Sequence, residues 1–356
     1  MSTPLLRTVI VGCGNVAKRY AEQIQSYPEV ELLGFSDMLP DRAEQFAQEY
    51  GGRAYATLDA VLGDDAVDLV VNLTIHHAHV EVITRCLEAG KHVHTEKPLA
   101  MDYEDARRMV ELAKTKQVRF SSAPITYLGE AHQTAMKVIR EGKLGPIRLI
   151  YAEVNHGRIE AWHPNPEPFY AVGPLWDVGI YPVTAITAAL GRAESVRAWA
   201  HTLYPDRVTK EDRAFTITSP DCYIAEIQLA SGAICRLTAN FYAKSRQGGG
   251  IEYTGDAGSL YVGNFQSFQA AVEYSEWGGK YEPVEHLQPA YQGIEFGRGV
   301  QDLAQAIQEN RPHRASAEHA AHVIEILCGI GEAAQEGKTV TIHSDFPAPE
   351  PMDWAK

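Results

Sequence analysis

Three features of this sequence combine residue types and spacings that are suited to chemistry. Two glycines, Gly12 and Gly14, follow a short apolar run, Lys97 lies within Thr-Glu-Lys-Pro-Leu, and Asp177 precedes Tyr181 by four residues. Closely spaced glycines let a backbone approach a phosphate group. A lysine can stabilise negative charge that develops on an oxygen, and an aspartate and a tyrosine can orient a reacting group or exchange protons with it.

The glycine pair belongs to a GxGxxA pattern at residues 12–17, directly after a predicted buried strand. Apolar residues then recur every four positions, which predicts an amphipathic helix. A strand, a glycine turn and a helix in this order form the dinucleotide-binding fingerprint, in which the helix N-terminus faces the pyrophosphate. The cofactor-binding residues expected here are Gly12, Gly14, Asn15 and Val16.

Asp37 ends the second predicted strand, 25 residues after Gly12. A carboxylate at this place can accept hydrogen bonds from the adenosine ribose hydroxyls and would repel a 2′-phosphate. It therefore predicts a preference for NAD(H) over NADP(H). The alternative is an aspartate that stabilises a turn or caps the following helix.

Predicted strands and helices alternate over residues 1–123, which indicates an α/β Rossmann domain with a doubly wound parallel sheet. Residues 124–343 predict an α+β domain with an open, mostly antiparallel sheet, and residues 344–356 form a proline-rich tail. The strands expected in the first domain are Thr8–Val11, Leu32–Phe35, Val67–Leu73, Val93–Thr95 and Val118–Ser121. Those expected in the second are Ile147–Val154, Val196–His201, Tyr223–Leu229, Ala233–Phe241, Ile251–Thr254, Ser259–Val262 and Thr339–Ile342.

The formal net charge of −14 argues against a nucleic-acid-binding protein, because contacts with phosphate backbones need a basic surface. It also argues against docking on anionic membranes, and no apolar stretch approaches the length of a membrane span. The five cysteines are scattered and form no CxxC pair, so we expect neither disulfides nor a cysteine metal site. A reducing cytoplasm is the expected location.

Taken together, the GxGxxA turn, the Glu-Lys-Pro sequence and the segment Asp-Val-Gly-Ile-Tyr at 177–181 resemble the glucose–fructose oxidoreductase and inositol dehydrogenase family (Gfo/Idh/MocA) over essentially the whole chain. The resemblance implies that Glu96 and Lys97 contact the cofactor, and that Lys97 also contacts the substrate. It gives Tyr181 the role of acid or base and gives Asp177 that of orienting the substrate. Without it, Lys97 could be a solvated surface residue, Asp177 a helix cap and Tyr181 a core aromatic.

The sequence departs from the family pattern at two places. Many members carry a histidine where Tyr181 stands. The loop that the family often writes Thr-Pro-Asn-x-x-His matches here only at Thr74 and His79, which the resemblance places near the nicotinamide ribose. Three histidines in this loop, at 76, 77 and 79, could suggest a metal cluster, but no carboxylate or cysteine partner is evident, so no metal is expected.

A polar and aromatic loop at 155–164 precedes Asp177 and contains Arg158 and His163, which are candidates for substrate contact or for a structural role. The resemblance implies hydride transfer between nicotinamide and a secondary alcohol or carbonyl of a sugar, cyclitol or related polyol. Two alternatives remain: an NAD-using, redox-neutral glycosidase and a non-catalytic sensor of NAD or sugar. The resemblance also implies a homodimer or homotetramer formed through the sheet of the second domain.

Overall fold

The structure is a computed structural model that describes residues 5–245 and 249–356. Contacts between Cα atoms divide the chain into two units. The first unit comprises the chain up to Ile125 together with Glu295–Ile324, and the second comprises Thr126–Ile294 and Glu325–Lys356. Within the described ranges, none of the helices combines the length and the apolar character needed to cross a membrane.

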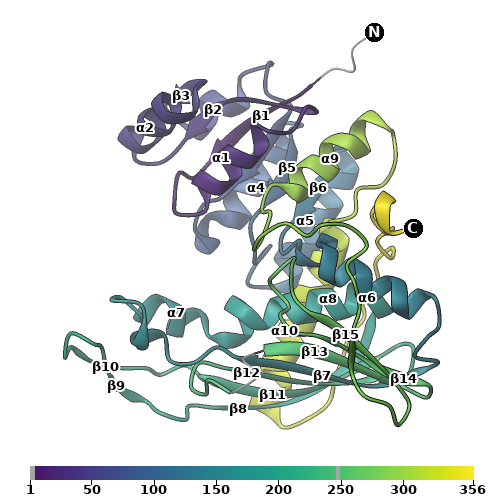
Figure 1. The fold of residues 1–356 in the computed structure, drawn as a ribbon. Coiled ribbons are helices and arrows are strands. Elements are labelled where there is room, and N and C mark those ends of the chain that lie inside the picture. Colours follow the sequence, from purple (N-terminus) through teal and green to yellow (C-terminus); the bar gives the residue numbers. More distant parts are fainter. Residues whose placement is uncertain (1–4, 246–248) are drawn as a thin grey trace. The chain divides into compact units, whose positions relative to one another are not determined.

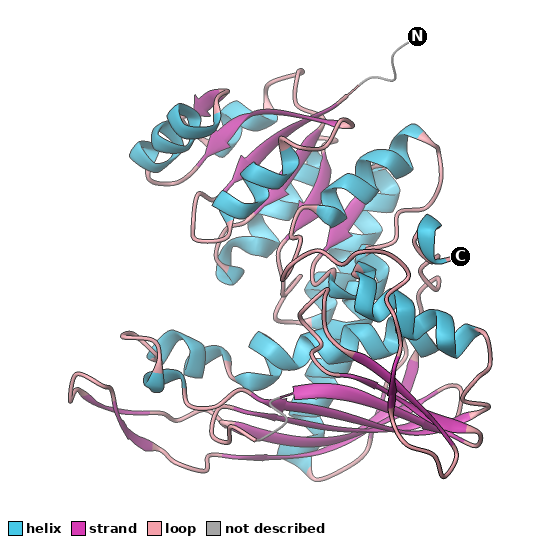
Figure 2. Cartoon of the chain, in the orientation of Figure 1, coloured by secondary structure: helices cyan, strands magenta, loops and turns pink. Residues whose placement is uncertain are grey.

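The first unit contains a six-stranded parallel sheet with the strand order β3-β2-β1-β4-β5-β6 (Figures 1 and 2). Its strands are β1 (Leu6–Val11), β2 (Val30–Ser36), β3 (Arg53–Tyr55), β4 (Leu69–Asn72), β5 (His92–Thr95) and β6 (Phe120–Ser122). Its helices are α1 (Ala17–Ile24), α2 (Pro40–Tyr50), α3 (Leu58–Leu62), α4 (His79–Glu88), α5 (Tyr103–Lys116) and α9 (Arg298–Gln308). The order reverses between β1 and β4, and parallel sheets bind ligands beyond the carboxyl ends of the strands at such a point.

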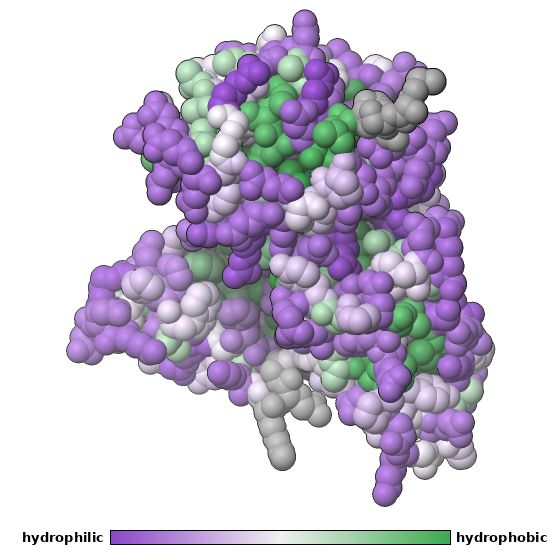
Figure 3. Space-filling view, turned by 45° about the horizontal axis from the view of Figure 1, so that its top comes forward, coloured by the Kyte–Doolittle hydropathy of each residue, from purple (hydrophilic) through white to green (hydrophobic). Residues whose placement is uncertain are grey.

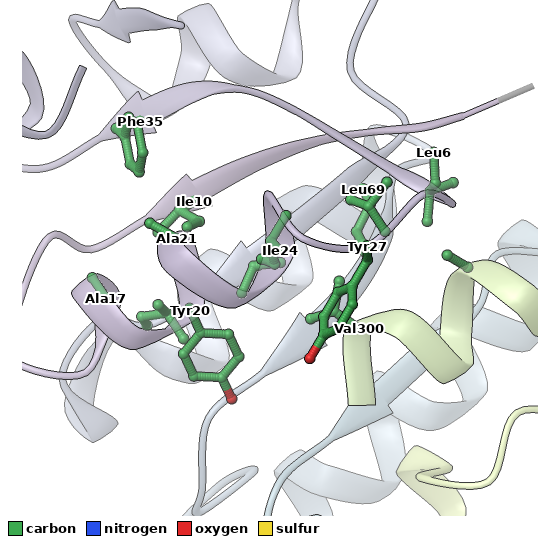
Figure 4. Close-up of a cluster of buried hydrophobic side chains, with 14 of the residues drawn as sticks. Leu6, Ile10, Ala17, Tyr20, Ala21, Ile24, Tyr27, Phe35, Leu69 and Val300 are labelled. Carbon is green, nitrogen blue, oxygen red and sulfur yellow. The ribbon is translucent and has the colours of Figure 1, made fainter. Parts of the chain in front are cut away.

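The core of the first unit forms where α1 packs on this sheet (Figure 4). Tyr20 and Ile24 lie on one face of α1 because they are four residues apart, and both are fully buried. Burying a side chain of this size contributes about 1.5–3 kcal/mol. The same cluster includes Val300 and Leu303 of α9. The range 124–343 expected for the second domain includes α9, whereas the core contacts of this helix lie in the first unit.

The second unit contains a nine-stranded sheet with the order β16-β15-β14-β13-β7-β12-β11-β8-β17. All its pairs are antiparallel except that of β7 with β12. Its strands are β7 (Ile147–Asn155), β8 (Ala193–His201), β11 (Cys222–Leu229), β12 (Ile234–Asn240), β13 (Gly249–Gly255), β14 (Gly258–Val262), β15 (Val272–Glu276), β16 (Glu282–Pro283) and β17 (Val340–Thr341). A separate hairpin joins β9 (Asp206–Val208) and β10 (Ala214–Thr216).

Helices of the second unit lie along one face of this sheet (Figure 1). They are α6 (Glu130–Arg140), α7 (Glu167–Val172) and α8 (Ile180–Leu190), and α10 (Ala317–Glu336) begins in the first unit and ends in the second. Short helical turns are η1 (His76–Ala78), η2 (Thr126–Leu128), η3 (Ile159–Ala161), η4 (Leu175–Gly179) and η5 (Asp353–Ala355).

The fold class predicted from the sequence is confirmed in both units: the first sheet is parallel, and the second is mostly antiparallel with one parallel pair. Each predicted strand overlaps an observed one. The sequence did not predict α8, because nine of its residues from Ile180 to Ala188 are buried and such a helix has no polar face to give a period. On the face of the molecule in Figure 3, hydrophilic residues predominate around smaller hydrophobic patches, as expected for a chain with a net charge of −14.

Candidate active site

The two glycines of the turn after β1 serve different purposes. Gly12 has a φ of +98°, and a Cβ built on it would lie 2.6 Å from the carbonyl carbon of Leu73, so the first glycine is required by the fold itself. Gly14 is exposed, and a Cβ on it would meet nothing within 4 Å. The missing side chain of Gly14 therefore leaves open space just before α1, where the helix N-terminus offers backbone N–H groups.

Asp37 lies against the same turn. Its Oδ2 accepts a hydrogen bond of 2.7 Å from the backbone N–H of Cys13, and its Oδ1 accepts one of 2.9 Å from that of Leu39. Asp37 does not cap α2, because the N-cap residue of this helix is Leu39. Each oxygen keeps further accepting capacity because a carboxylate offers about four lone-pair positions. Asp37 is thus a turn residue whose carboxylate is fixed beside the glycine turn.

The Glu-Lys-Pro sequence begins one residue after β5 ends at Thr95. The backbone N–H of Glu96 donates to the carbonyl of Asn72 at the end of β4, over 3.0 Å. Oε2 of Glu96 accepts from the backbone N–H of Lys97 over 3.1 Å, and the Lys97–Pro98 peptide bond is cis. These bonds place the tripeptide at the carboxyl edge of the parallel sheet, next to the reversal of strand order.

A chain of hydrogen bonds through the buried side chains of Tyr20 and His94 fixes the carboxylate of Glu96. The Tyr20 hydroxyl donates to Oε1 of Glu96 over 2.8 Å and lies 3.3 Å from Nε2 of His94. Nδ1 of His94 lies 2.8 Å from the Ser121 hydroxyl. Burial lowers the pKa of His94 to about 3, so its ring is neutral near pH 7. The sequence does not mark Tyr20 as a site residue, because its place among the regularly spaced apolar residues of α1 predicts only that it lies in the core.

His79 contacts both the loop after β4 and the Glu-Lys-Pro segment. It is 1% exposed, its Nδ1 lies 2.7 Å from the carbonyl oxygen of Pro98, and its Nε2 lies 3.1 Å from that of Thr74. Burial lowers the pKa of His79, and a neutral imidazole donates to only one of these carbonyls. The Thr74 hydroxyl in turn donates to Oδ1 of Asn72 over 2.7 Å. His79 therefore fixes the loop after β4 relative to Pro98.

The other two loop histidines pack against each other with their ring planes tilted by 42°. The ring centroids of His76 and His77 are 3.9 Å apart. Burial lowers the pKa of His76, and the charges of His77, His79 and Lys97 act in the same direction. Among the residues that the structure describes, no three His, Cys, Asp or Glu side chains are grouped so that they could hold a metal ion.

In the second unit, Asp177 and Tyr181 flank the start of α8. Asp177 lies within the five-residue π-helical segment η4 and is half-buried. Asp177 and Tyr181 therefore lie in consecutive helical segments, because α8 begins only at Ile180. Single π-helical turns are rare and occur often at functional sites. Tyr181 is 8% exposed, and its ring centroid lies 6.4 Å from that of Phe265.

Arg158 and His163 both lie among aromatic side chains. The guanidinium of Arg158 lies over two rings, 4.6 Å from the centroid of Tyr204 and 4.7 Å from that of Tyr242. The ring of His163 packs against Trp162 and Phe169, with centroid distances of 5.5 and 4.9 Å. Nδ1 of His163 accepts from the backbone N–H of Asn165, over 3.1 Å. Cation–π stacking and ring packing fix the orientation of both side chains.

A buried ion-pair cluster that the sequence did not predict supports the aromatic loop at 155–164. Arg207 of β9 is 1% exposed and forms salt bridges with Glu160 at 2.8 Å and with Asp221. It also donates to the Tyr170 hydroxyl over 2.7 Å. The cluster ties the β9–β10 hairpin to the loop before α7 and to the start of β11. No local pattern marks these residues, because their sequence separations are set by tertiary pairing.

Comparison with known protein families gives two matches along the chain. Residues 6–123 match the model of an oxidoreductase family with an NAD-binding Rossmann fold, named GFO_IDH_MocA. Residues 132–261 match the model of the GFO/IDH/MocA C-terminal domain.

Curated relatives include a dTDP-3,4-didehydro-2,6-dideoxy-alpha-D-glucose 3-reductase from Actinomadura kijaniata, 29% identical over 52% of this chain and 56% of that protein. A 1,5-anhydro-D-fructose reductase from Ensifer adhaerens is 27% identical over 70% of this chain and 74% of that protein. The chain spans about half the length of several curated relatives that it matches, between 39% and 59%. Among solved structures, a levoglucosan dehydrogenase in complex with NADH and levoglucosan superposes with a TM-score of 0.83 at 21% identity, covering 95% of this chain and all of that one. This likeness concerns the fold.

Proposed function

This chain belongs to the Gfo/Idh/MocA oxidoreductase family, and from this premise we propose that it is an NAD(H)-dependent dehydrogenase or reductase of a sugar, cyclitol or related polyol. The observation that carries the proposal is the position of Glu96 and Lys97 at the carboxyl end of β5, held by Asn72 and Tyr20 beside the reversal of strand order. The relatives named as reductases of a dTDP-sugar and of 1,5-anhydro-D-fructose support the substrate class.

The described residues fit a dinucleotide. The open space at Gly14 and the N-terminus of α1 suit a pyrophosphate, and the fixed carboxylate of Asp37 suits the two ribose hydroxyls. Asn15 and Val16 complete the turn, and Thr74 and His79 shape the loop after β4. The carboxylate of Asp37 is the reason for proposing NAD(H) over NADP(H), since it would lie against a 2′-phosphate. When bound, the nicotinamide supplies or accepts the hydride.

We assign the proton chemistry to three side chains. Tyr181 gives a proton to, or takes one from, the reacting oxygen of the substrate. The ammonium group of Lys97 stabilises negative charge on that oxygen and so lowers the pKa of the hydroxyl. Asp177 orients the substrate through its hydroxyl groups. Arg158 and His163 are proposed as further substrate contacts, presented by the aromatic loop.

The direct test is to measure NADH absorbance with the purified chain, NAD or NADP, and a panel of aldoses, inositols and anhydrosugars. Reduction of NAD by one sugar class supports the proposal, and a clear preference for NADP would overturn the role of Asp37. Release of a sugar from a glycoside without net NADH would indicate the redox-neutral glycosidase instead. Tight NAD binding without any turnover would favour the sensor.

We also propose that the chain forms a homo-oligomer through the exposed face of the nine-stranded sheet. Trp199, Ile224 and Ile234 are 55%, 40% and 37% exposed, and Trp199 lies directly opposite Ile224 on the neighbouring strand. Exposed apolar residues grouped on a sheet face favour association. Light scattering on the purified chain should give the mass of a dimer or tetramer, and a monomer at micromolar concentration would contradict the proposal.

A further inference from the structure

The short helical turn η1 in the first unit carries two histidines close to the Glu-Lys-Pro segment. His76 and His77 are its first two residues and follow the loop after β4. The backbone N–H of His79 donates to the carbonyl of His76, and Nδ1 of His79 lies 2.7 Å from the carbonyl oxygen of Pro98. His79 thus connects the backbone of His76 to the Glu-Lys-Pro segment.

The side chain of His76 is half-buried and lies among groups that carry or can carry positive charge. The ring of His77, which is exposed, packs against it with a centroid distance of 3.9 Å. Burial lowers the pKa of His76 from 6.5, and the charges of His77, His79 and Lys97 lower it further. His79 is neutral near pH 7, so Lys97 supplies the cation to which His76 is coupled.

The proposed reaction determines what else lies near Lys97. The ammonium group of Lys97 is assigned to the oxygen on the reacting carbon, and hydride passes between that carbon and the nicotinamide ring. Atoms that react with each other approach to about 3–3.5 Å. A charged group that is coupled to Lys97 is therefore within range of a charge on the nicotinamide ring, since screening in water acts over about 8–10 Å.

The two redox states of the cofactor differ in charge at this ring. The oxidised ring of NAD⁺ carries a positive charge and the reduced ring of NADH is neutral, whereas their adenosine and pyrophosphate groups are identical. A cationic His76 repels the oxidised ring more than the reduced one, and a neutral His76 does not discriminate between them by charge. This coupling is reciprocal, so protonation of His76 weakens the binding of NAD⁺ relative to that of NADH.

We propose that His76 is a specificity-determining residue that, when protonated, selects the reduced cofactor over the oxidised one. The inference rests on the proposed NAD(H)-dependent function and on the role assigned to Lys97. Above about pH 6.5 His76 is neutral and the preference between the two cofactors is constant. As the pH falls through the lowered pKa of His76, the ring gains charge and the preference for NADH increases.

Calorimetric titration of the full chain with NADH and with NAD⁺, at pH 5.5 and pH 8, tests the proposal without requiring turnover. The quantity to compare is the Kd of NAD⁺ divided by the Kd of NADH. Effects of pH on the shared adenosine and pyrophosphate contacts cancel in this ratio. We expect the ratio to be about threefold larger at pH 5.5 than at pH 8, because the repulsion between the like charges is partly screened.

H76N keeps a polar side chain that cannot be protonated, and it should give the same ratio at both pH values. The matched control is H77Q, at the exposed neighbour on the same turn, which should retain most of the wild-type change. The inference is overturned if the wild-type ratio does not rise at pH 5.5, if H76N keeps the rise, or if H77Q abolishes it. A rise in a chain that oxidises no sugar or polyol would refute the proposed substrate class and leave this inference standing, whereas binding of neither cofactor would overturn both.

Discussion

The two units hold their candidate site residues by different interactions. In the first unit, Asp37, His79, Glu96 and the backbone of Lys97 are fixed by hydrogen bonds of 2.7 to 3.1 Å to strand ends and turns. In the second, Arg158 and His163 are held mainly by packing against aromatic rings. Hydrogen bonds are directional, whereas ring packing tolerates change in its neighbours. The candidate residues of the first unit are therefore oriented by directional hydrogen bonds, whereas those of the loop at 155–164 are oriented by ring packing.

The strongest test of the first unit is K97M. If Lys97 stabilises charge at the reacting oxygen, the variant should lose a factor of about 10²–10³ in kcat. The dissociation constant of NADH should stay within about twofold of the wild-type value, because the glycine turn and Asp37 are the proposed main contacts of the cofactor. Single-turnover kinetics and NADH fluorescence measure the two quantities. K114M, at an exposed lysine on α5, is the control. Near-normal turnover in K97M would refute the assignment.

The corresponding test of the second unit is R207M. Removing Arg207 leaves Glu160 and Asp221 buried without their cation, which should lower the free energy of unfolding by about 3–5 kcal/mol. R213M breaks the exposed pair with Glu167 and should cost about 0–1 kcal/mol. Urea unfolding of both variants gives the comparison. Equal destabilisation would mean that the aromatic loop does not depend on the buried cluster.

Lowering the pH should reduce the stability of the first unit more than that of the second. Burial lowers the pKa of His94 and His319 to about 3 in the first unit, and that of His132 to about 4 in the second. A lowered pKa means that the unfolded chain takes up the proton first. The stability is therefore complete above about pH 6.5 and falls as the pH decreases toward the folded values, by about 1.4 kcal/mol per pH unit for each such histidine.

Urea unfolding at pH 7 and pH 5 measures this loss in the wild type. The free energy of unfolding should depend less steeply on pH in H94Q, because this variant lacks one of the groups that take up a proton on unfolding. H201Q should show the wild-type dependence. If the free energy of unfolding of H94Q depends on pH as that of the wild type does, His94 does not take up a proton on unfolding. Burial would then not hold its ring neutral in the folded chain.

The smallest effect is expected for Y20F. The variant loses the hydrogen bond to Glu96 and keeps the ring in the core, so kcat should fall by up to about tenfold with little change in NADH binding. Y27F removes a comparable hydroxyl, which donates to Glu295 in the same unit, and should leave kcat unchanged. A fall in KM and kcat together, or the same effect in both variants, would indicate a general loss of stability.

Sequence alone predicted both fold classes, twelve of the strands, the glycine turn, and the positions of Asp37 and of the Glu-Lys-Pro segment after strand ends. These features are local: an apolar period gives a strand or helix, and a glycine pair gives a turn. The family resemblance added Asp177 and Tyr181 on the same basis, as a short motif. The apolar period of α1 predicts that Tyr20 lies in the core, where it is fully buried.

Tertiary structure alone decided what those local features contact. The bond from Tyr20 to Glu96 joins residues 76 positions apart, and the cluster around Arg207 joins three elements. The π-helical turn at Asp177 packs against β12, where a Cβ on Gly179 would lie 3.5 Å from that of Ala239. Such long-range pairing leaves no period in the sequence, because only the folded chain brings the partners within hydrogen-bonding distance.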